Sequence, residues 1–197
     1  MRTELGTTSW VDLDPNWLPA AEADDLLTSL LADLSWAARP IVVFGKEVMQ
    51  PRLIAWCGEV PYKYSGQVLE PTPFTPALGA LNQRVSELLD VPFNHVLLNR
   101  YRDGKDNMGM HADDERQLGR DPVIAALSLG VTRKFALRHK RKRRWRKHLQ
   151  LTHGSLLVMG GRCQHEWHHG VPKQMRVTEE RINVTFRWLK EGVEPAR

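Results

Sequence analysis

Residues 181–188 alternate polar and apolar side chains without a break, and this pattern strongly constrains the fold. The polar positions are Arg181, Asn183, Thr185 and Arg187, and the apolar positions are Ile182, Val184, Phe186 and Trp188. Period-two alternation predicts a strand with one buried face. The polar face is either the wet side of an edge strand or the lining of a barrel. Inside a barrel the two arginines would need anionic partners such as a dicarboxylic acid, because a buried unpaired guanidinium is costly.

Two helices are expected before the strands. Leucines at helical spacing in residues 19–34 predict an amphipathic helix that Pro19 opens, and Thr75 with Pro76 is typical of the start of a second one. After residue 92 the pattern turns to strands, which we place near 94–102, 123–130, 133–140, 155–160 and 181–189. This order predicts an α+β domain, and a double-stranded β-helix fits it: a cupin-like jelly roll with the N-terminal helices packed on one face.

The 197 residues are enough for one domain with a proper core. We expect residues 1–18, which lack clear periodicity, to form an N-terminal extension over the surface. Residues 19–197 then form a single domain, with helices and a recognition lid in 19–92 and the jelly-roll core in 93–190. No apolar run approaches membrane-spanning length, and no secretory signal is visible, so we expect no membrane partner.

The two cysteines, Cys57 and Cys163, could in principle pair. Low cysteine usage nevertheless favours free thiols in a reducing compartment, which is the cytoplasm, or the nucleus in a eukaryote. No oligomer is implied.

The positive charge is concentrated in residues 138–147, which contain eight of the 28 lysines and arginines. Without these eight, 20 basic residues face 23 acidic ones, so the rest of the chain is mildly acidic. Such a run will not pack into a core. It is either a solvated loop or an arm that contacts nucleic-acid phosphates, and Trp145 within it would stack, wedge or anchor the loop.

A candidate metal site begins with His111 and Asp113, whose side chains point the same way on an extended segment. Two histidines and one carboxylate on one face of octahedral Fe(II) leave three positions open. The pair alone is more often a solvated turn. The third ligand must come from far along the chain, where His165, His168 and His169 compete, and spacing does not choose among them.

On the strand expected near 94–102, Asn99 and Tyr101 share a face and could donate to carboxylate oxygens, although Tyr101 could equally be a core aromatic. Together these residues resemble the AlkB family of Fe(II)/2-oxoglutarate-dependent alkylated-DNA-repair dioxygenases over roughly residues 40–190. The matching positions are Asn99-Arg100-Tyr101, Gly104, His111-x-Asp113, His153-Gly154-Ser155, His169 and Arg181-x-Asn183-x-Thr185-x-Arg187. The chain also resembles the branch of this family that repairs duplex DNA. The matching stretches are Val43-Phe44-Gly45-Lys46, Tyr62-Lys63-Tyr64-Ser65-Gly66, His111-Ala112-Asp113-Asp114-Glu115 and Arg138-His139-Lys140.

The resemblance implies the same jelly-roll fold, with Fe(II), 2-oxoglutarate as cosubstrate and O₂. It also implies that His169 is the third ligand beside His111 and Asp113. Arg187 would pair with Asp113 or with the carboxylate beside the metal. The implied cosubstrate-binding residues are Asn99, Tyr101, Arg181, Asn183, Thr185 and Arg187, with Arg181, Tyr101 and Asn99 at the far carboxylate.

The implied activity is oxidative demethylation of 1-methyladenine and 3-methylcytosine in alkylated DNA, with release of formaldehyde. Reaching a base inside a duplex requires extruding it. Phe44 would be the intercalating finger, unless residues 42–44 form a plain buried strand. The other substrate-binding candidates are Lys46 and Arg138 with Lys140 at phosphates, Tyr62, Tyr64 and Ser65 in a lid over the base, and Glu115 at an exocyclic amine.

Two alternatives stay open. One is the same chemistry on RNA or single-stranded DNA, which neither Phe44 nor the basic run excludes. The other is a non-catalytic, basic nucleic-acid-binding module with a vestigial or zinc-holding triad. The residues of the expected cosubstrate pocket count against this second alternative, because binding DNA requires no such pocket.

Overall fold

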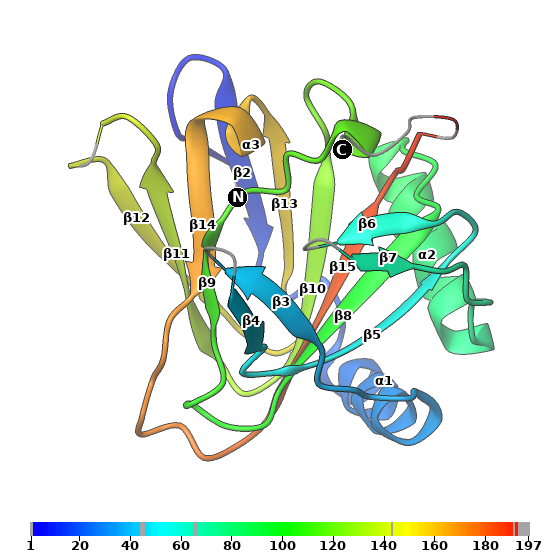
Figure 1. Ribbon diagram of the computed structural model, residues 1–197. Helices are drawn as coiled ribbons and strands as arrows, with labels where there is room; N and C mark the ends of the chain where they lie inside the picture. Colours follow the sequence, from blue (N-terminus) through cyan, green and yellow to red (C-terminus); the bar gives the residue numbers. More distant parts are fainter. Residues whose placement is uncertain (1, 44–45, 65–66, 143, 191, 193–197) are drawn as a thin grey trace.

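The computed structural model describes all residues except 1, 44–45, 65–66, 143, 191 and 193–197, and it consists mainly of two antiparallel sheets that face each other (Figure 1). The larger sheet contains, in spatial order, β1 (Arg2–Glu4), β2 (Ser9–Asp14), β13 (Leu156–Gly161), β10 (Ile124–Gly130), β15 (Arg181–Arg187), β8 (His95–Tyr101) and β5 (Leu53–Gly58). The smaller sheet contains β12 (Arg146–Leu151), β11 (Arg133–His139), β14 (Trp167–Val171) and β9 (Met108–His111). The predicted jelly roll is confirmed.

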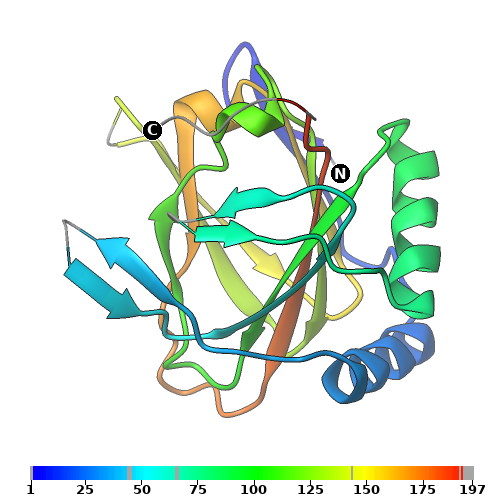
Figure 2. The same ribbon diagram turned by 45° about the vertical axis from the view of Figure 1, so that its right-hand side comes forward.

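Both predicted helices are present and lie on the same side of the molecule, against the larger sheet (Figure 2). They are α1 (Ala20–Asp33) and α2 (Pro76–Leu89). The start of α2 follows from its sequence, because Thr75 Oγ1 accepts the Leu78 backbone N–H at 3.3 Å and Pro76 occupies the first turn. The helices cover the outer face of the sheet, and a second hydrophobic cluster lies between the two sheets.

One face of β15 packs beneath the helices, and the other face lies between the two sheets. Ile182, Val184 and Phe186 belong to the cluster beneath the helices. The arginines Arg181 and Arg187 are buried on the opposite face, between the sheets. The polar face of this strand therefore lines the barrel, and the edge-strand alternative is wrong.

Residues 1–18 and the basic run differ from what the sequence suggested. β2 pairs with β13 along its whole length, so the N-terminal segment is part of the larger sheet rather than an irregular cover. The basic run forms the end of a β-hairpin, in which Arg138 of β11 lies opposite Arg146 of β12. Leu149 and Leu151 follow in β12 and pack on the core, which explains why a strand forms directly after so many charges.

Four short elements lie around the barrel opening. Two hairpins project on the same side of it, β3 (Pro40–Val43) with β4 (Lys46–Met49) and β6 (Tyr62–Tyr64) with β7 (Gln67–Leu69) (Figures 1 and 2). The 3-10 helix η1 (Arg116–Leu118) follows the His111 segment, and α3 (Cys163–Glu166) precedes β14. Among the residues described, no helix is long and apolar enough to cross a membrane, and both cysteines are buried and free.

Candidate metal and cosubstrate site

The structure brings His111, Asp113 and His169 together between the sheets. β9 and β14 pair antiparallel with His111 directly opposite His169, and Asp113 lies two residues beyond the end of β9. One potential ligand atom from each residue lies within 4.8 Å of the others. Two imidazoles and one carboxylate at this spacing fit Fe(II) and leave positions for further ligands.

The two competing histidines lie elsewhere. His165 Nε2 contacts the Arg120 carbonyl and lies 3.6 Å from Asp121 Oδ1. His168 is the neighbour of His169 on β14, and it pairs across the sheet with Arg138. Because successive side chains of a strand point to opposite faces, His168 is directed away from the cavity that His169 lines.

The protonation states of the three residues suit metal binding. Burial lowers the pKa of His169 to about 3 and also lowers that of His111. Burial alone would raise the pKa of Asp113, but the positive charge of Arg187 and the two histidines outweigh it and lower this pKa to about 2. At neutral pH the site therefore offers two neutral imidazoles and a carboxylate, the forms that bind a metal.

Two buried side chains hold Asp113. Arg187 Nη2 donates to Asp113 Oδ2 at 3.0 Å, and Gln164 Oε1 accepts the Asp113 backbone N–H at 3.0 Å. His111 is oriented by the contact of its Nδ1 with the Gly109 carbonyl at 3.0 Å, which leaves Nε2 for a metal. Sequence reasoning missed Gln164, and only its position beside the candidate histidines could have drawn attention to it.

A cavity extends from the metal-binding residues along β8 and β15, lined in part by Asn99, Tyr101, Asn183 and Thr185. Arg181 contacts the Tyr101 ring, with its guanidinium carbon 5.3 Å from the ring centroid. Its Nη2 donates to Ser128 Oγ and to Asn183 Oδ1, both at 2.8 Å.

The other two nitrogens of Arg181, Nε and Nη1, are buried without a hydrogen-bond partner among the described residues. Burial lowers the pKa of this guanidinium to about 10. A buried cation with free donors fits a carboxylate, which accepts charge-assisted hydrogen bonds from it. The arrangement therefore suits one end of a dicarboxylic acid such as 2-oxoglutarate.

Arg52 is a second residue that sequence reasoning missed. It is 4% exposed, and its Nε donates to Asn99 Oδ1 at 2.6 Å. A guanidinium has only donors, so it fixes the oxygen of the Asn99 amide and leaves the NH₂ group for the cavity. No local pattern marks Arg52, because the contact joins residues 47 positions apart.

The expected base-binding residues are only partly visible. Phe44 and Ser65 lie outside the described residues, as do the side chains of Lys46 and Tyr64. Tyr62 is fully buried, with its ring 4.8 Å from that of His95 in an edge-on contact and the Arg187 guanidinium 5.5 Å away.

Glu115 lies near Asp113 in the same region. Burial raises its pKa to about 7, the charge of Asp113 adds to this effect, and Arg187 opposes it. This carboxyl group can therefore hold a proton near neutral pH.

The two basic candidates lie on the hairpin side. Lys140 Nζ donates to Asp114 Oδ2 at 3.0 Å and to the Gln164 carbonyl at 2.9 Å, while Arg138 is exposed on β11. Lys140 thus links the basic run to the segment that carries Asp113.

With this geometry in view, the chain matches the 2OG-Fe(II) oxygenase superfamily over residues 11–187, and it belongs to that superfamily. Membership implies Fe(II), 2-oxoglutarate and O₂, which the side chains described above fit. A solved structure titled "The structure of OsALKBH1" supports the fold, with a TM-score of 0.57, 16% identity, and coverage of 90% of this chain and 97% of that one.

Within the superfamily, the chain resembles AlkB homologues, as predicted. It is 42% identical over 188 residues to the human alpha-ketoglutarate-dependent dioxygenase alkB homolog 3, covering 91% of this chain and 66% of that protein. It is 40% identical over 179 residues to the mouse DNA oxidative demethylase ALKBH2, covering 85% of this chain and 75% of that protein. The chain thus spans slightly less than two thirds of the human homologue's length.

Proposed function

We propose that the protein is an Fe(II)/2-oxoglutarate-dependent dioxygenase that removes N-linked methyl groups from bases of alkylated DNA, with 1-methyladenine and 3-methylcytosine as substrates. One observation carries the proposal: the cluster of His111, Asp113 and His169 lines a cavity whose neighbouring Arg181 has two unpaired nitrogens. A relative named as a DNA oxidative demethylase supports the substrate class.

His111, Asp113 and His169 would hold the iron, already in the right protonation states. When bound, iron with 2-oxoglutarate and O₂ supplies the oxidation of an N-methyl C–H bond, after which formaldehyde leaves and the base is restored. Arg187 keeps Asp113 ionised and in place through its 3.0 Å hydrogen bond. The burial of Asp113 and His169 would keep water from this side of the reacting methyl group.

Arg181 would bind the far carboxylate of the cosubstrate. Asn183 Oδ1 accepts from Arg181, and Asn183 Nδ2 donates to Thr185 Oγ1 at 2.7 Å, so the polar face of β15 is pre-organised around this end. Asn99, oriented by Arg52, presents its NH₂ group, and the Tyr101 ring closes the same side of the cavity.

The substrate base would enter from the side of the two short hairpins. Glu115, with a pKa of about 7, would bind its exocyclic amine when ionised and donate to a ring acceptor when protonated. Phe44 would fill the gap left by the extruded base, with Lys46 at a phosphate and with Tyr62, Tyr64 and Ser65 forming the lid.

The hairpin of β11 and β12 would contact the DNA backbone. Lys142, Arg144 and Arg146 are exposed at or near its tip, and Lys142 Nζ lies 4.0 Å from the centroid of the exposed Trp145 ring. Together with Arg138, these cations would bind phosphates largely independently of sequence. We propose duplex DNA as the preferred form, with single-stranded DNA or RNA as the alternatives that a direct test must separate.

Formaldehyde release from one 1-methyladenine oligonucleotide, single-stranded and in a duplex, tests the proposal. We expect release only with Fe(II) and 2-oxoglutarate, abolished by His169→Ala and retained by His168→Ala, the matched change on the neighbouring residue. If the protein binds the oligonucleotide without metal and releases no formaldehyde, only the alternative of a nucleic-acid-binding module remains. Faster release from the single strand would reverse the proposed preference for duplex DNA.

A further inference from the structure

Arg133 is a fourth buried arginine, next to the cavity-lining residue Tyr101, and no role has yet been assigned to it. It is the first residue of β11 and has no exposed surface. Gly130, at the end of β10, pairs with Arg181, so the short β10–β11 turn places Arg133 beside Arg181. The two guanidinium carbons lie 5.5 and 5.3 Å from the centroid of the same Tyr101 ring.

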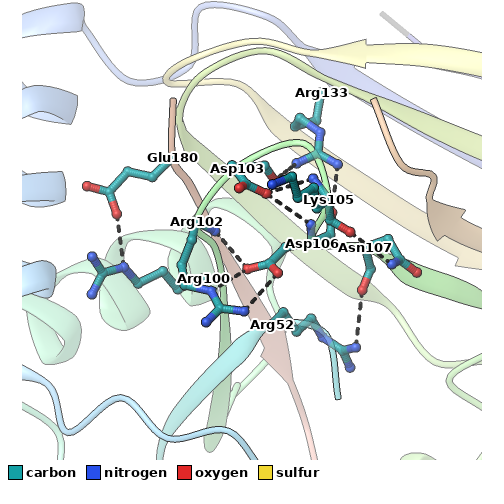
Figure 3. Close-up of polar contacts among 9 residues, drawn as sticks. All are labelled: Arg52, Arg100, Arg102, Asp103, Lys105, Asp106, Asn107, Arg133 and Glu180. Carbon is teal, nitrogen blue, oxygen red and sulfur yellow. Dashed lines mark hydrogen bonds and ion pairs between the residues drawn. The ribbon is translucent and has the colours of Figure 1, made fainter. Parts of the chain in front are cut away.

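The hydrogen bonds of Arg133 go to neutral oxygen atoms. Nη1 donates to the Asp103 carbonyl at 3.0 Å, and Nη2 donates to the Asp106 carbonyl at 2.9 Å (Figure 3). Nη2 also donates to the Pro172 carbonyl at 3.0 Å. Nε donates to Gln174 Oε1 at 3.4 Å. None of the ion pairs found among the described residues includes Arg133. The nearby carboxylates of Asp103 and Asp106 offset its charge in part, but burial outweighs them and lowers the pKa of this guanidinium.

Fixing these loops does not by itself require a charge. Gly104 N–H donates to the Val177 carbonyl and Gln174 N–H to the Gly104 carbonyl, both at 2.9 Å, so backbone bonds already join the 102–107 and 172–180 segments. A neutral donor would satisfy the same carbonyls at a smaller desolvation cost. The positive charge itself therefore calls for an explanation.

The explanation lies in the neighbouring Arg181. Burial is the main cause that lowers the pKa of Arg181, and the charge of Arg133 adds to it, so the two cations repel each other. An anion that accepts a hydrogen bond from a free nitrogen of Arg181 would relieve this repulsion and be attracted by both guanidinium groups.

We propose that Arg133 is a positioning residue for the far carboxylate of the cosubstrate, whose fixed charge makes the site select a 2-oxo diacid over a 2-oxo monoacid. The inference rests on the proposed function. It assigns the recognition of this carboxylate to two arginines, one in contact with it and one behind Tyr101.

Arg102 provides a matched control within the same network. Its Nε and Nη2 bind the two carboxylate oxygens of Asp106 at 2.8 and 2.9 Å, and its side chain is 55% exposed (Figure 3). Arg102 thus holds the same loop as Arg133, but from solvent and with its charge neutralised by Asp106. Loss of Arg102 loosens the loop without removing buried charge from the cavity.

The test is anaerobic calorimetric titration of the Fe(II)-loaded protein with 2-oxoglutarate and with 2-oxopentanoate, which has a methyl group in place of the far carboxylate. We expect Arg133→Met to bind 2-oxoglutarate roughly tenfold more weakly, because a buried charge acts over this range, with little change for 2-oxopentanoate. Arg102→Gln should preserve both affinities. Arg133→Lys, which keeps the charge, should retain most of the diacid preference even where its melting temperature falls.

If Arg133→Met lowers the affinity for both acids by the same factor, the residue is purely structural and the inference is overturned. Loss of the diacid preference in Arg133→Lys would also overturn it, and this variant decides the question should Arg133→Met not fold. If the unmodified protein binds neither acid, the proposed function itself fails. If the unmodified protein prefers the diacid and the Arg133→Met variant keeps the same preference, only this inference fails.

Discussion

Replacing Arg187 by methionine should strongly destabilise the metal-free protein. Arg187 and Asp113 form an ion pair at 3.0 Å, with side chains only 2% and 4% exposed. The change leaves the Asp113 carboxylate buried without its counter-charge, and breaking a buried pair in this way costs about 3–5 kcal/mol.

The pKa of Asp113 gives an independent magnitude. Its value of about 2, against an ordinary 3.8, means that the folded state holds this carboxylate more strongly ionised than the unfolded state does. This difference contributes about 2 kcal/mol of stability above pH 4, which is lost as the pH falls toward 2. Arg187 is the largest of the effects that lower this pKa, and His169 and His111 contribute to it as well.

Urea unfolding in the presence of a chelator, at neutral pH, measures the effect. Arg187→Met should lower the unfolding free energy by about 3–5 kcal/mol, or the melting temperature by roughly 10 °C. Arg100→Met is the matched control, because Arg100 and Glu180 form a half-exposed pair at 2.9 Å whose removal should cost at most about 1 kcal/mol.

A double-mutant cycle with Asp113→Asn isolates the pair. The double variant should be at least about 2 kcal/mol more stable than the sum of the single effects predicts, because a neutral amide at this position no longer needs a cation. A divalent metal should restore part of the stability of Arg187→Met, since the ion supplies positive charge beside Asp113. A coupling below about 0.5 kcal/mol would refute the argument that Arg187 stabilises the ionised ligand.

Three further predictions concern other parts of the molecule. Burial and the charge of Arg187 lower the pKa of His95 to about 3, so this residue stays neutral in the fold while the unfolded chain gains a proton below pH 6.5. His95 should therefore contribute a fall in stability of about 2 kcal/mol between pH 7 and pH 5, and His95→Phe should remove this share of the pH dependence in urea titrations while the share of His169 remains. Changing Lys142 and Arg144 to glutamine should reduce the salt slope of DNA binding by about 0.9 per lost phosphate contact, and an unchanged slope would exclude both from the interface. Phe44→Ala should slow formaldehyde release from duplex more than from single-stranded DNA, whereas equal losses would remove its role as the intercalating finger.

The elements and the residues of the polar face could be predicted because their signals are local. Period-two alternation predicted β15 and placed its two arginines on one face, and Thr75 with Pro76 marked the start of α2. Apolar spacing within a few residues is enough to decide which face of a strand or helix is buried. Strand β12 was not predicted, because the charges of the basic run favoured a loop. Leu149 and Leu151 stabilise this strand by packing on the core.

The supporting residues of the site could not be predicted. Arg52 binds Asn99 from 47 positions away, and Gln164 binds Asp113 from 51 positions away. Neither residue belongs to a local pattern, since an amide or a guanidinium acquires its role only when packing brings it to a partner. Arg133 is similar, because its three carbonyl partners come from two loops that meet only in the folded barrel.

By itself the sequence determined which chemical groups share a face: a histidine and an aspartate two residues apart, and arginines on the polar side of one strand. Whether that polar face lay inside the barrel was decided by the tertiary structure. The sequence left three histidines as candidates for the third ligand, and the family resemblance alone favoured His169. The tertiary structure placed His169 beside His111, through the antiparallel pairing of β14 with β9. That pairing depends on how whole strands, far apart in the chain, bury their apolar faces together, and a shift of one residue would turn His168 inward instead.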